Sequence, residues 1–280
     1  MSLELGLQLY SVRESLRQNP IDTLQRIAEI GYKNLELALQ NKDANIQAAG
    51  MSAADFRREI EGLGMKTVSC HARVNEDDMD RLLDFLQEIG SPTVVIPMAL
   101  LNGRQHALDY CRTLNKYGEA ARKRDISLYY HNHFQEFQEF EGEKIMDTLI
   151  NNTDPELVKF ELDTYWTVRG GEDPIHWIRK LGNRCDLFHQ KDLPNSVEQV
   201  NFFEVFGTDA PITMDMMYQT QIPAQFTESG EGVLDIASYV KEIRSLNQAK
   251  YIFIEQDMTS RGELESIAIS YRNMTELLKG

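Results

Sequence analysis

The sequence predicts a single-domain (β/α)8 barrel, in which eight parallel strands alternate with helices and close into a ring. Eight strand-like runs alternate with helical patterns, and one type of helix-to-strand junction recurs between them. The chain has 280 residues, of which 42% are hydrophobic, enough for one large core. Strands that alternate with helices pair in parallel through right-handed crossovers, and eight such units favour a closed barrel over an open sheet.

The eight strands are predicted from short apolar runs. They begin near Leu5, Asn34, Thr67, Thr93, Ile126, Leu157, Cys185 and Tyr251. No Gly-x-Gly-x-x-Gly motif follows the first run, which argues against a dinucleotide-binding sheet. No inter-domain linker interrupts the pattern, so we expect residues 1–280 to form one domain.

The helices are predicted from caps, apolar stripes and a recurring end signal. Asn19 is expected to cap a helix that begins at Pro20, and Ser52 and Asn75 to cap helices with acidic first turns. Apolar residues at helical spacing continue two of these helices: Ile21, Leu24, Ile27, Ala28 and Ile30, then Leu82, Leu83, Leu86 and Ile89. A Gly or Asn after an aliphatic residue is expected to end five helices in the left-handed conformation: Gly31, Gly64, Gly90, Gly182 and Asn247.

One long insertion interrupts the regular alternation of strands and helices, between the seventh and eighth strands. The seventh strand ends near Asp192, and the helix before the eighth is predicted over residues 234–246, so residues 193–233 form an inserted loop. It is too apolar for a flexible linker, since it contains Phe202, Phe203, Phe206, Met214, Met216, Met217, Tyr218 and Phe226. We expect a lid or a partner-contact loop, with an ordinary packing excursion as the alternative. Exposed apolar surface there is compatible with a homodimer.

Charge and cysteine usage exclude several classes of protein. Lys and Arg total 29 and Asp and Glu total 44, so the net charge is −15, which is unsuited to non-specific duplex binding. No apolar run is long enough for a transmembrane helix, and the N-terminus lacks the pattern of a signal peptide. Cys70, Cys111 and Cys185 are odd in number, lack a C-x-x-C pair and are expected to be buried thiols. We therefore expect a cytoplasmic protein with neither a nucleic-acid nor a membrane partner.

Polar residues gather at the predicted carboxyl ends of the strands, where parallel barrels place their chemistry. They are Gln8, Tyr10, Arg13, Glu36, His71, the run 130–133 with Glu136, and the runs 161–166, 189–192 and 255–257. Four of the six histidines, His71, His131, His133 and His189, are among them. Any one of these histidines could be a purely structural, hydrogen-bonded core residue. Four histidines at matching strand ends, with carboxylates beside them, are better explained by a functional site.

Asp163, His189 and Glu255 follow three successive strands and are expected to converge on one point of the barrel mouth. Two carboxylates and an imidazole suit one divalent ion of Mn, Co, Mg, Fe or Zn, without selecting among them. The alternative is a metal-free cluster of hydrogen bonds and salt bridges. A divalent ion at a sugar carbonyl would stabilise the enediolate formed when the adjacent carbon loses a proton, with carboxylates as general base and acid.

Six segments, taken in order along nearly the whole chain, carry a family resemblance. They are the run 7–13, Ile30-Gly31-Tyr32 before Leu35-Glu36-Leu37, the run 130–133 with Glu136-Phe137, the run 162–166 before 170–174, His189-Gln190-Lys191-Asp192, and Gly230-Glu231-Gly232. Together they resemble the sugar phosphate isomerase/epimerase group of the xylose isomerase-like TIM barrels, within the AP endonuclease 2 superfamily. The motifs do not identify a substrate.

The resemblance implies a metal-dependent aldose–ketose isomerase, ketose 3-epimerase or related enzyme acting on a small sugar. It implies ligands from strands five to eight, here Asp163, His189 and Glu255 on the last three. Strand five departs from the pattern because it carries His131 and His133 where Glu is usual. His131 is taken as the fourth ligand, with His133 or Glu136 as substitutes. This departure puts a mechanism with two carboxylate bases in doubt.

Further roles are assigned to residues beside the expected ligands. Glu255, His131 and Lys191 are the predicted catalytic residues; Lys191 would bind an oxyanion or hydroxyl, or else pair with Asp192 or Glu255. The predicted substrate contacts are His71, Glu36, His133, Glu136, Trp166 and Gln8. Glu36 could instead orient a ligand, and Trp166 could pack under the insertion rather than line the pocket.

Three functional classes remain open from the sequence. The first is the isomerase or epimerase, together with a dehydratase of an inosose or keto-sugar, which starts from the same enediolate. The second is a DNA-repair endonuclease of the type IV kind, disfavoured by the charge of −15 and by too few candidate ligands. The third is a non-catalytic sugar-binding barrel. Metal analysis would distinguish them: about one ion per chain favours the isomerase class, three favour the repair endonuclease, and none favours the sugar-binding barrel.

Overall fold

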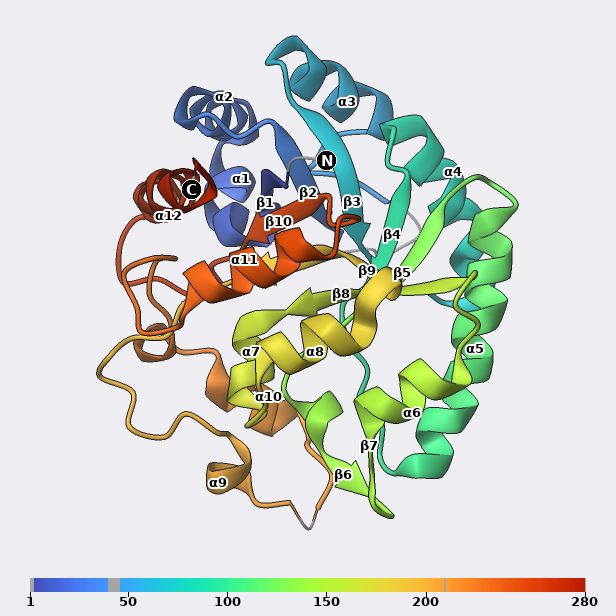
Figure 1. Cartoon of the computed structure of the whole chain (residues 1–280). Coiled ribbons are helices and arrows are strands. Elements are labelled where there is room, and N and C mark those ends of the chain that lie inside the picture. The colour runs from blue at the N-terminus through green and yellow to red at the C-terminus, as the bar shows by residue number, and fades with distance from the viewer. Residues whose placement is uncertain (1–2, 40–45, 209, 280) are drawn as a thin grey trace.

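The computed structural model describes residues 3–39, 46–208 and 210–279 and shows a closed barrel of parallel strands surrounded by helices (Figure 1). In barrel order the strands are β1 (Glu4–Gln8), β2 (Asn34–Ala38), β3 (Lys66–His71), β4 (Thr93–Ile96), β5 (Ser127–His131), β8 (Val158–Asp163), β9 (Cys185–Gln190) and β10 (Tyr251–Ile254). β1 pairs with both β2 and β10, which closes the ring. Each strand begins within one residue of its predicted start, and the single-domain (β/α)8 fold is confirmed.

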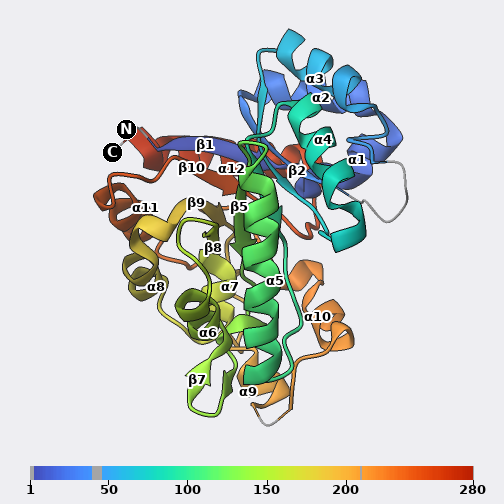
Figure 2. The ribbon, with the colours of Figure 1, turned by 90° about the vertical axis from the view of Figure 1, so that its right-hand side faces the viewer.

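The helices follow the predicted alternation. They are α1 (Arg13–Gln18), α2 (Pro20–Ile30), α3 (Ala53–Gly62), α4 (Met79–Ile89), α5 (Arg104–Arg122), α6 (Ile145–Asn152), α7 (Thr164–Arg169), α8 (Pro174–Leu181), α9 (Phe203–Phe206), α10 (Met214–Thr220), α11 (Ile236–Ser245) and α12 (Glu263–Lys279). A small hairpin, β6 (Glu139–Phe140) and β7 (Glu143–Lys144), precedes α6. Figures 1 and 2 place α9, α10 and this hairpin at the same end of the molecule. Within the described part of the chain, no helix combines the length and apolar character needed to cross a bilayer.

The five predicted helix ends are confirmed, and the three predicted cap residues stand at the start of helical segments, but only Ser52 makes a side-chain capping bond. Gly31, Gly64, Gly90, Gly182 and Asn247 all have positive φ. Ser52 caps α3 by accepting from the Asp55 N–H, as expected. Asn19 separates two helices: its N–H ends α1 by donating to Ser15 O (2.9 Å), and it precedes Pro20 of α2 without a side-chain capping bond. Asn75 precedes a 3-10 turn, Glu76–Asp78, so α4 begins only at Met79.

The barrel interior is layered along its axis. An apolar layer of Val68, Val95, Tyr129, Leu187 and Phe253 fills the middle. The polar strand ends lie beyond it at the carboxyl end, and buried Asp186 lies at the opposite end. The three cysteines are free and buried in the outer core, as predicted.

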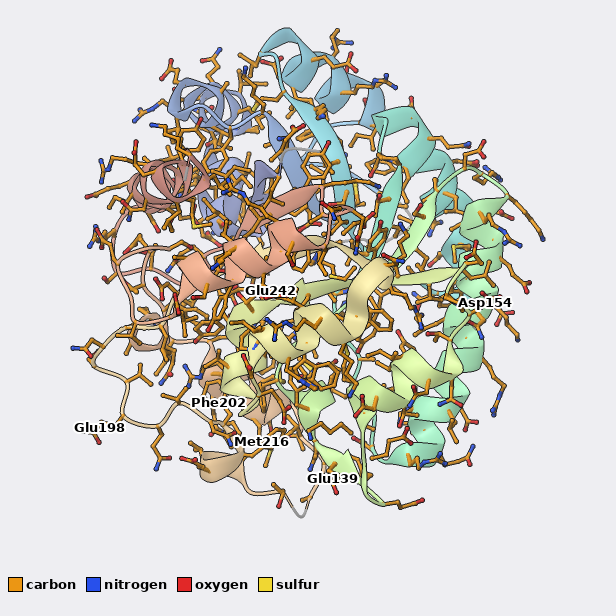
Figure 3. The ribbon with its side chains drawn as sticks, in the orientation of Figure 1. Glu139, Asp154, Glu198, Phe202, Met216 and Glu242 are labelled. Atoms are coloured by element: carbon orange, nitrogen blue, oxygen red, sulfur yellow. The ribbon has the colours of Figure 1, made fainter. Side chains whose placement is uncertain are left out.

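The insertion 193–233 packs against residues that follow β5 and β8. Phe202, Ile212, Met217 and Phe226 are buried in one cluster with Phe134, Tyr165, Trp166 and Leu193. Polar residues such as Glu198 project from its outer edge (Figure 3). Val205, Met214, Tyr218, Ile222 and Val233 are its exposed apolar residues, so contact with a partner or a second copy stays a prediction.

A single carboxylate, that of Asp192, holds both ends of the insertion. Its Oδ1 accepts from the N–H groups of Leu193 (2.8 Å) and Leu234 (3.2 Å), and its Oδ2 from those of Gly230 and Gly232 (both 2.9 Å). A Cβ atom on Gly232 would collide with this carboxylate, which explains why the Gly-Glu-Gly segment needs glycine there. The sequence motif is therefore a carboxylate-binding turn.

Replacing Asp192 with Asn should lower the free energy of unfolding by about 2–3 kcal/mol, because one carboxamide oxygen cannot accept from four N–H groups that are buried or partly buried. Urea unfolding followed by far-UV circular dichroism would measure the change. Asp235→Asn is the control: Asp235 is an exposed cap of α11, and its loss should cost about 1 kcal/mol or less. Equal stability of Asp192→Asn and the wild type would contradict the role assigned to Asp192.

Asp186 should make the free energy of unfolding depend on pH. Burial opposes its ionisation, but the Tyr129 hydroxyl (2.6 Å), Lys250 (2.9 Å) and Lys159 (3.1 Å) outweigh burial and lower its pKa. A carboxyl group whose pKa is lower in the folded state stabilises the fold at pH values above its unfolded-state pKa. This stabilisation is lost as the pH falls through the folded-state pKa. Asp186→Asn should cost about 1–3 kcal/mol at pH 7, and the gap to wild type should shrink below about pH 4. A pH-independent gap in urea titrations would refute this.

Candidate metal centre

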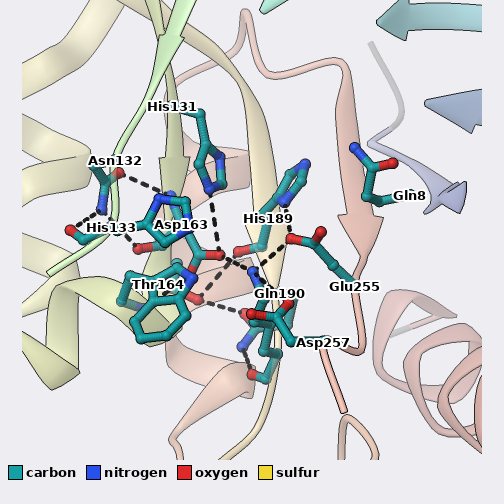
Figure 4. Close-up of polar contacts among 12 residues, drawn as sticks. Gln8, His131, Asn132, His133, Asp163, Thr164, His189, Gln190, Glu255 and Asp257 are labelled. Carbon is teal, nitrogen blue, oxygen red and sulfur yellow. Dashed lines mark hydrogen bonds and ion pairs between the residues drawn. The ribbon is translucent and has the colours of Figure 1, made fainter. Parts of the chain in front are cut away.

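Strand register brings the polar residues to one level of the barrel mouth (Figure 4). Asp163 on β8 lies directly beside His189 on β9, and Glu255 immediately follows β10, with its N–H bonded to Gln190 O. Side chains alternate between the two faces of a strand, so these three point into the barrel rather than toward the helices. The closed parallel ring therefore positions them without help from the loops.

The structure brings together the four residues predicted as metal ligands. One ligand atom from each of His131, Asp163, His189 and Glu255 lies within 4.8 Å of all the others. His189 Nδ1 is 3.0 Å from Glu255 Oε2, and His131 Nε2 is 3.9 Å from Asp163 Oδ2. All four side chains are buried, which keeps competing water away. We call these four residues the outer group; their role as ligands stays a prediction.

Lys191 is a buried cation at the centre of this group. Its Nζ lies 2.5 Å from Asp163 Oδ2, 2.6 Å from Glu255 Oε2 and 3.5 Å from Asp257 Oδ1. Burial disfavours the ammonium form, but the three carboxylates outweigh burial and hold its pKa well above the usual range. Of the two alternative salt bridges, the structure forms the one to Glu255, because Asp192 faces the backbone of the insertion instead.

His189 presents one ring nitrogen to each of two sets of carboxylates. Nδ1 faces Glu255, while Nε2 contacts Glu36 and lies 3.3 Å from Glu161. Burial favours the neutral ring, yet Glu161 and Glu36 raise its pKa well above the usual value. A divalent ion bound at Nδ1 would replace the proton that Nδ1 carries in the charged ring. The remaining Nε2–H would then donate to Glu36, which fixes the tautomer and orients the ring.

The two strand-five histidines differ in surroundings. Burial is the first cause that lowers the pKa of both, to about 3 for His133, so both rings are neutral and able to act as ligands. His131 lies against the His189 ring, with centroids 4.6 Å apart, whereas the His133 ring lies 5.0 Å from that of Trp166. Among the described residues, the groups that could hold a metal include His131 and not His133.

Among the described residues, Glu136 is not part of either group that could hold a metal, so it does not replace His131 there. After His133 the chain enters a 3-10 turn, Gln135–Phe137, that directs the carboxylate back toward Tyr130. Its oxygens accept from the Tyr130 hydroxyl (2.6 Å) and the His133 N–H (2.8 Å). Burial raises its pKa to about 7. These contacts make Glu136 a support for the loop after β5, and its predicted contact with substrate stays a prediction.

Of the other residues predicted to contact substrate, some hydrogen-bond to residues of the site and one forms a wall beside the outer group. Gln8 donates to Glu36 (2.9 Å), and Glu36 in turn contacts His189, so both fix the position of a ligand. His71 donates to or accepts from Glu161 (2.7 Å). Trp166 is fully buried under the insertion, but its ring also lies 5.7 Å from Lys191 Nζ and so walls the group on one side.

Three residues of the site received no role from the sequence: Ser69 was not noted, and Glu161 and Asp257 were noted only among the polar residues at strand ends. Glu161 lies two residues before Asp163, and Ser69 two before His71, so strand alternation places each pair on the same inner face. Applying that rule to every strand would have found both. Asp257 contacts Lys191 and accepts from Gln221 of the insertion (3.0 Å), which periodicity cannot predict.

Comparison with known proteins identifies the family of this barrel. Residues 24–272 match the family described as xylose isomerase-like TIM barrel. The chain belongs to this family. Among its curated relatives, the inosose dehydratase of Clostridium tetani is 29% identical over 159 residues, 56% of this chain and 50% of that protein. That of Clostridium botulinum strain Eklund 17B is 24% identical over 206 residues, 65% of this chain and 63% of that protein.

The matches to curated relatives thus span about half to two thirds of those proteins. Solved structures show the same barrel over the full length. A sugar phosphate isomerase/epimerase from Parabacteroides distasonis has a TM-score of 0.71 at 22% identity, covering 98% of both chains. The probable 3-DHS dehydratase AsbF from Bacillus anthracis has a TM-score of 0.69 at 12% identity, covering 98% of this chain and 99% of that one. At these identities the likeness establishes the shared fold.

The donor set of this xylose isomerase-like barrel fits a divalent ion. Two carboxylates and neutral imidazole nitrogens are the mixed oxygen and nitrogen donors that Mn, Fe, Co and Zn accept. Asp163, His189 and Glu255 would hold the ion, and His131 lies within reach. The ammonium of Lys191 already contacts the same two carboxylates, so it would share them with the ion.

Replacing Lys191 with Met should therefore affect stability in a metal-dependent way. Without metal, the variant leaves buried carboxylates unpaired and should lose about 3–5 kcal/mol. Added Mn²⁺ should raise its Tm more than that of the wild type, because the ion no longer competes with an ammonium group. Differential scanning calorimetry with and without Mn²⁺ measures both effects.

Lys159→Met is the matched control, because Lys159 pairs with Asp186 outside the group. Its Tm should rise with Mn²⁺ by the same amount as that of the wild type. A Lys191→Met variant whose Tm responds to Mn²⁺ no more than the control would refute the shared use of Asp163 and Glu255.

Proposed function

We propose that this barrel is a divalent-metal-dependent enzyme that removes the proton next to the carbonyl of a keto-sugar or keto-polyol, and that water is then lost. The substrate class follows the curated relatives, which are named inosose dehydratases. The small-molecule substrate agrees with the net charge of −15, which is unsuited to a nucleic acid. A divalent ion in the outer group would polarise the substrate carbonyl and stabilise the negative charge that develops on its oxygen.

One observation carries the choice of dehydration: a carboxylate and an ammonium group lie side by side in a buried site. Glu255 Oε2 and Lys191 Nζ are 2.6 Å apart. Elimination of water needs a base for the proton next to the carbonyl and an acid for the departing hydroxyl group. The strand-five position offers His131 where the resemblance implies Glu, so the outer group lacks the strand-five carboxylate expected as one of an epimerase's two bases.

The two groups can complete the reaction and return to their starting state. Glu255 takes the proton from carbon, and the electron pair of that C–H bond is first held by the substrate as an enolate. That pair then forms the new carbon–carbon double bond as the C–O bond of the departing hydroxyl breaks. Lys191 gives its proton to that hydroxyl, which leaves as water. Glu255 then holds a proton and Lys191 lacks one, and the contact between them lets the proton pass back. Glu255 is the base of choice because its side chain is 10% exposed, whereas Asp163 and Glu161 are fully buried.

Isomerisation or epimerisation of a ketose is the second candidate. Neutral His131 lies opposite Glu255 in the outer group and would serve as the second base. In that reaction the proton returns to carbon and no water leaves. The two candidates share the first step and differ in the fate of the hydroxyl group.

The test incubates the metal-loaded protein with an inosose and a panel of ketoses in D₂O, followed by mass spectrometry. Dehydration gives a product lighter by one water. Isomerisation or epimerisation gives products of unchanged composition, with deuterium incorporated wherever the abstracted proton exchanges with solvent. Substrate binding without turnover or exchange would leave a sugar-binding barrel, and cleavage of abasic DNA would point to repair.

Glu255→Gln should lower kcat by at least about 10²-fold while the circular dichroism spectrum stays unchanged, because the base is lost and the shape is kept. Lys191→Met should keep deuterium exchange next to the carbonyl but lose elimination. Glu242→Gln is the matched control, since Glu242 pairs with Arg179 on the surface. Full turnover by Glu255→Gln would overturn the site assignment.

A further inference from the structure

We propose that the barrel holds a second divalent cation in an inner group, one layer below the outer group, formed by His71, His131 and Glu161 with Glu36 as a fourth donor. Glu161 lies two residues before Asp163 on β8, so this group is deeper in the barrel. Its own residues, His71, Glu161 and Glu36, come from β3, β8 and β2 and do not belong to the outer group. The inference stands apart from the reaction proposed above.

The donor atoms are spaced as they would be around one ion. Glu161 Oε2 lies 2.7 Å from His71 Nε2 and 3.3 Å from both His131 Nδ1 and His189 Nε2. Glu36 Oε2 is 3.3 Å from the same His71 nitrogen. Donors bound at about 2.0–2.2 Å to one ion lie about 3.0–3.5 Å apart, so little rearrangement is needed. One ligand atom from each of His71, His131, Glu161 and His189 falls within 4.8 Å of the others.

Two donors in this group lack a hydrogen-bond partner. Glu161 Oε1 and His131 Nδ1 are buried and unsatisfied, although Glu161 is 0% and His131 1% exposed. Most buried polar side-chain atoms in proteins are paired, because an unpaired one costs about 1–3 kcal/mol. His131 Nδ1 faces the Glu161 carboxylate at 3.3 Å without the geometry of a hydrogen bond. A cation held by His131 Nδ1 and by both oxygens of the Glu161 carboxylate would satisfy the two unpaired atoms.

The charge of the inner group also calls for a cation. Glu36 and Glu161 are both fully buried and both contact the same nitrogens of His71 and His189. Lys191 is occupied by Asp163, Glu255 and Asp257 in the layer above. Without an ion, protonated rings of His71 and His189 must supply the positive charge that these two buried carboxylates require, and one divalent ion would take over that role.

The shared histidines can serve both layers without conflict. His131 turns Nδ1 toward Glu161, while His189 turns Nδ1 toward Glu255. With His131 assigned to the inner ion, Asp163, His189 and Glu255 remain for the outer ion. A site with four protein ligands is closed, as structural sites are, whereas a three-ligand site keeps a position open for substrate. Two imidazoles favour Mn, Fe, Co or Zn over Mg or Ca.

The test counts bound Mn²⁺ after equilibrium dialysis and locates it in anomalous-scattering maps. The wild type should bind two ions per chain. Glu161→Gln should lose the inner ion and keep the outer, and Glu255→Gln should do the reverse. Glu136→Gln, a change at a buried carboxylate outside both groups, should keep two. Should Glu161→Gln not fold, His71→Gln tests the same ion.

A wild-type count of one, or a Glu161→Gln variant that still binds two ions, would overturn the inner site. These outcomes are separate from the proposed reaction. A protein that dehydrates keto-sugars with one bound ion refutes only the inner site, and one that binds two ions but turns over no keto-sugar refutes only the reaction.

Discussion

The placement of a lysine ammonium group among buried carboxylates is the interaction on which the rest of this site depends. Asp163, Glu255 and Asp257 are all nearly inaccessible to solvent and converge on Lys191 Nζ within 3.5 Å. Without that charge, the mouth of the barrel would hold an uncompensated cluster of negative groups. In the proposed reaction the same ammonium group is the acid, so one residue would both permit burial of the carboxylates and donate a proton.

The parallel strands impose the layered arrangement. Inward-facing residues two positions apart on β8, Glu161 and Asp163, belong to successive levels, and His189 on the next strand spans both through its two ring nitrogens. The Phe253 layer below closes the interior against water. Assigning His131 to the lower level also removes a second base from the upper one, which agrees with elimination rather than epimerisation.

Sequence periodicity and turn chemistry predicted the fold nearly residue by residue, because strand starts and Gly or Asn helix ends are local signals. The convergence of Asp163, His189 and Glu255 could also be predicted, since it follows from strand ends alone. Glu136 could not be placed, because its direction depends on a turn formed after β5. Glu161 was assigned no role although alternation reveals it. The bond from Gln221 to Asp257 joins distant segments, and no local pattern encodes it.

The junction at Asp192 has a consequence for how such barrels diversify. Both ends of the insertion after β9 bind the side chain of Asp192. The closure of the insertion at its base therefore does not depend on how many residues lie between the two ends. Loop-closure entropy rises only slowly with length, so longer or shorter excursions are tolerated. That excursion packs beside Trp166 and reaches Asp257. Exchanging it is therefore a route by which a common scaffold acquires new substrate preferences while its reacting groups stay fixed.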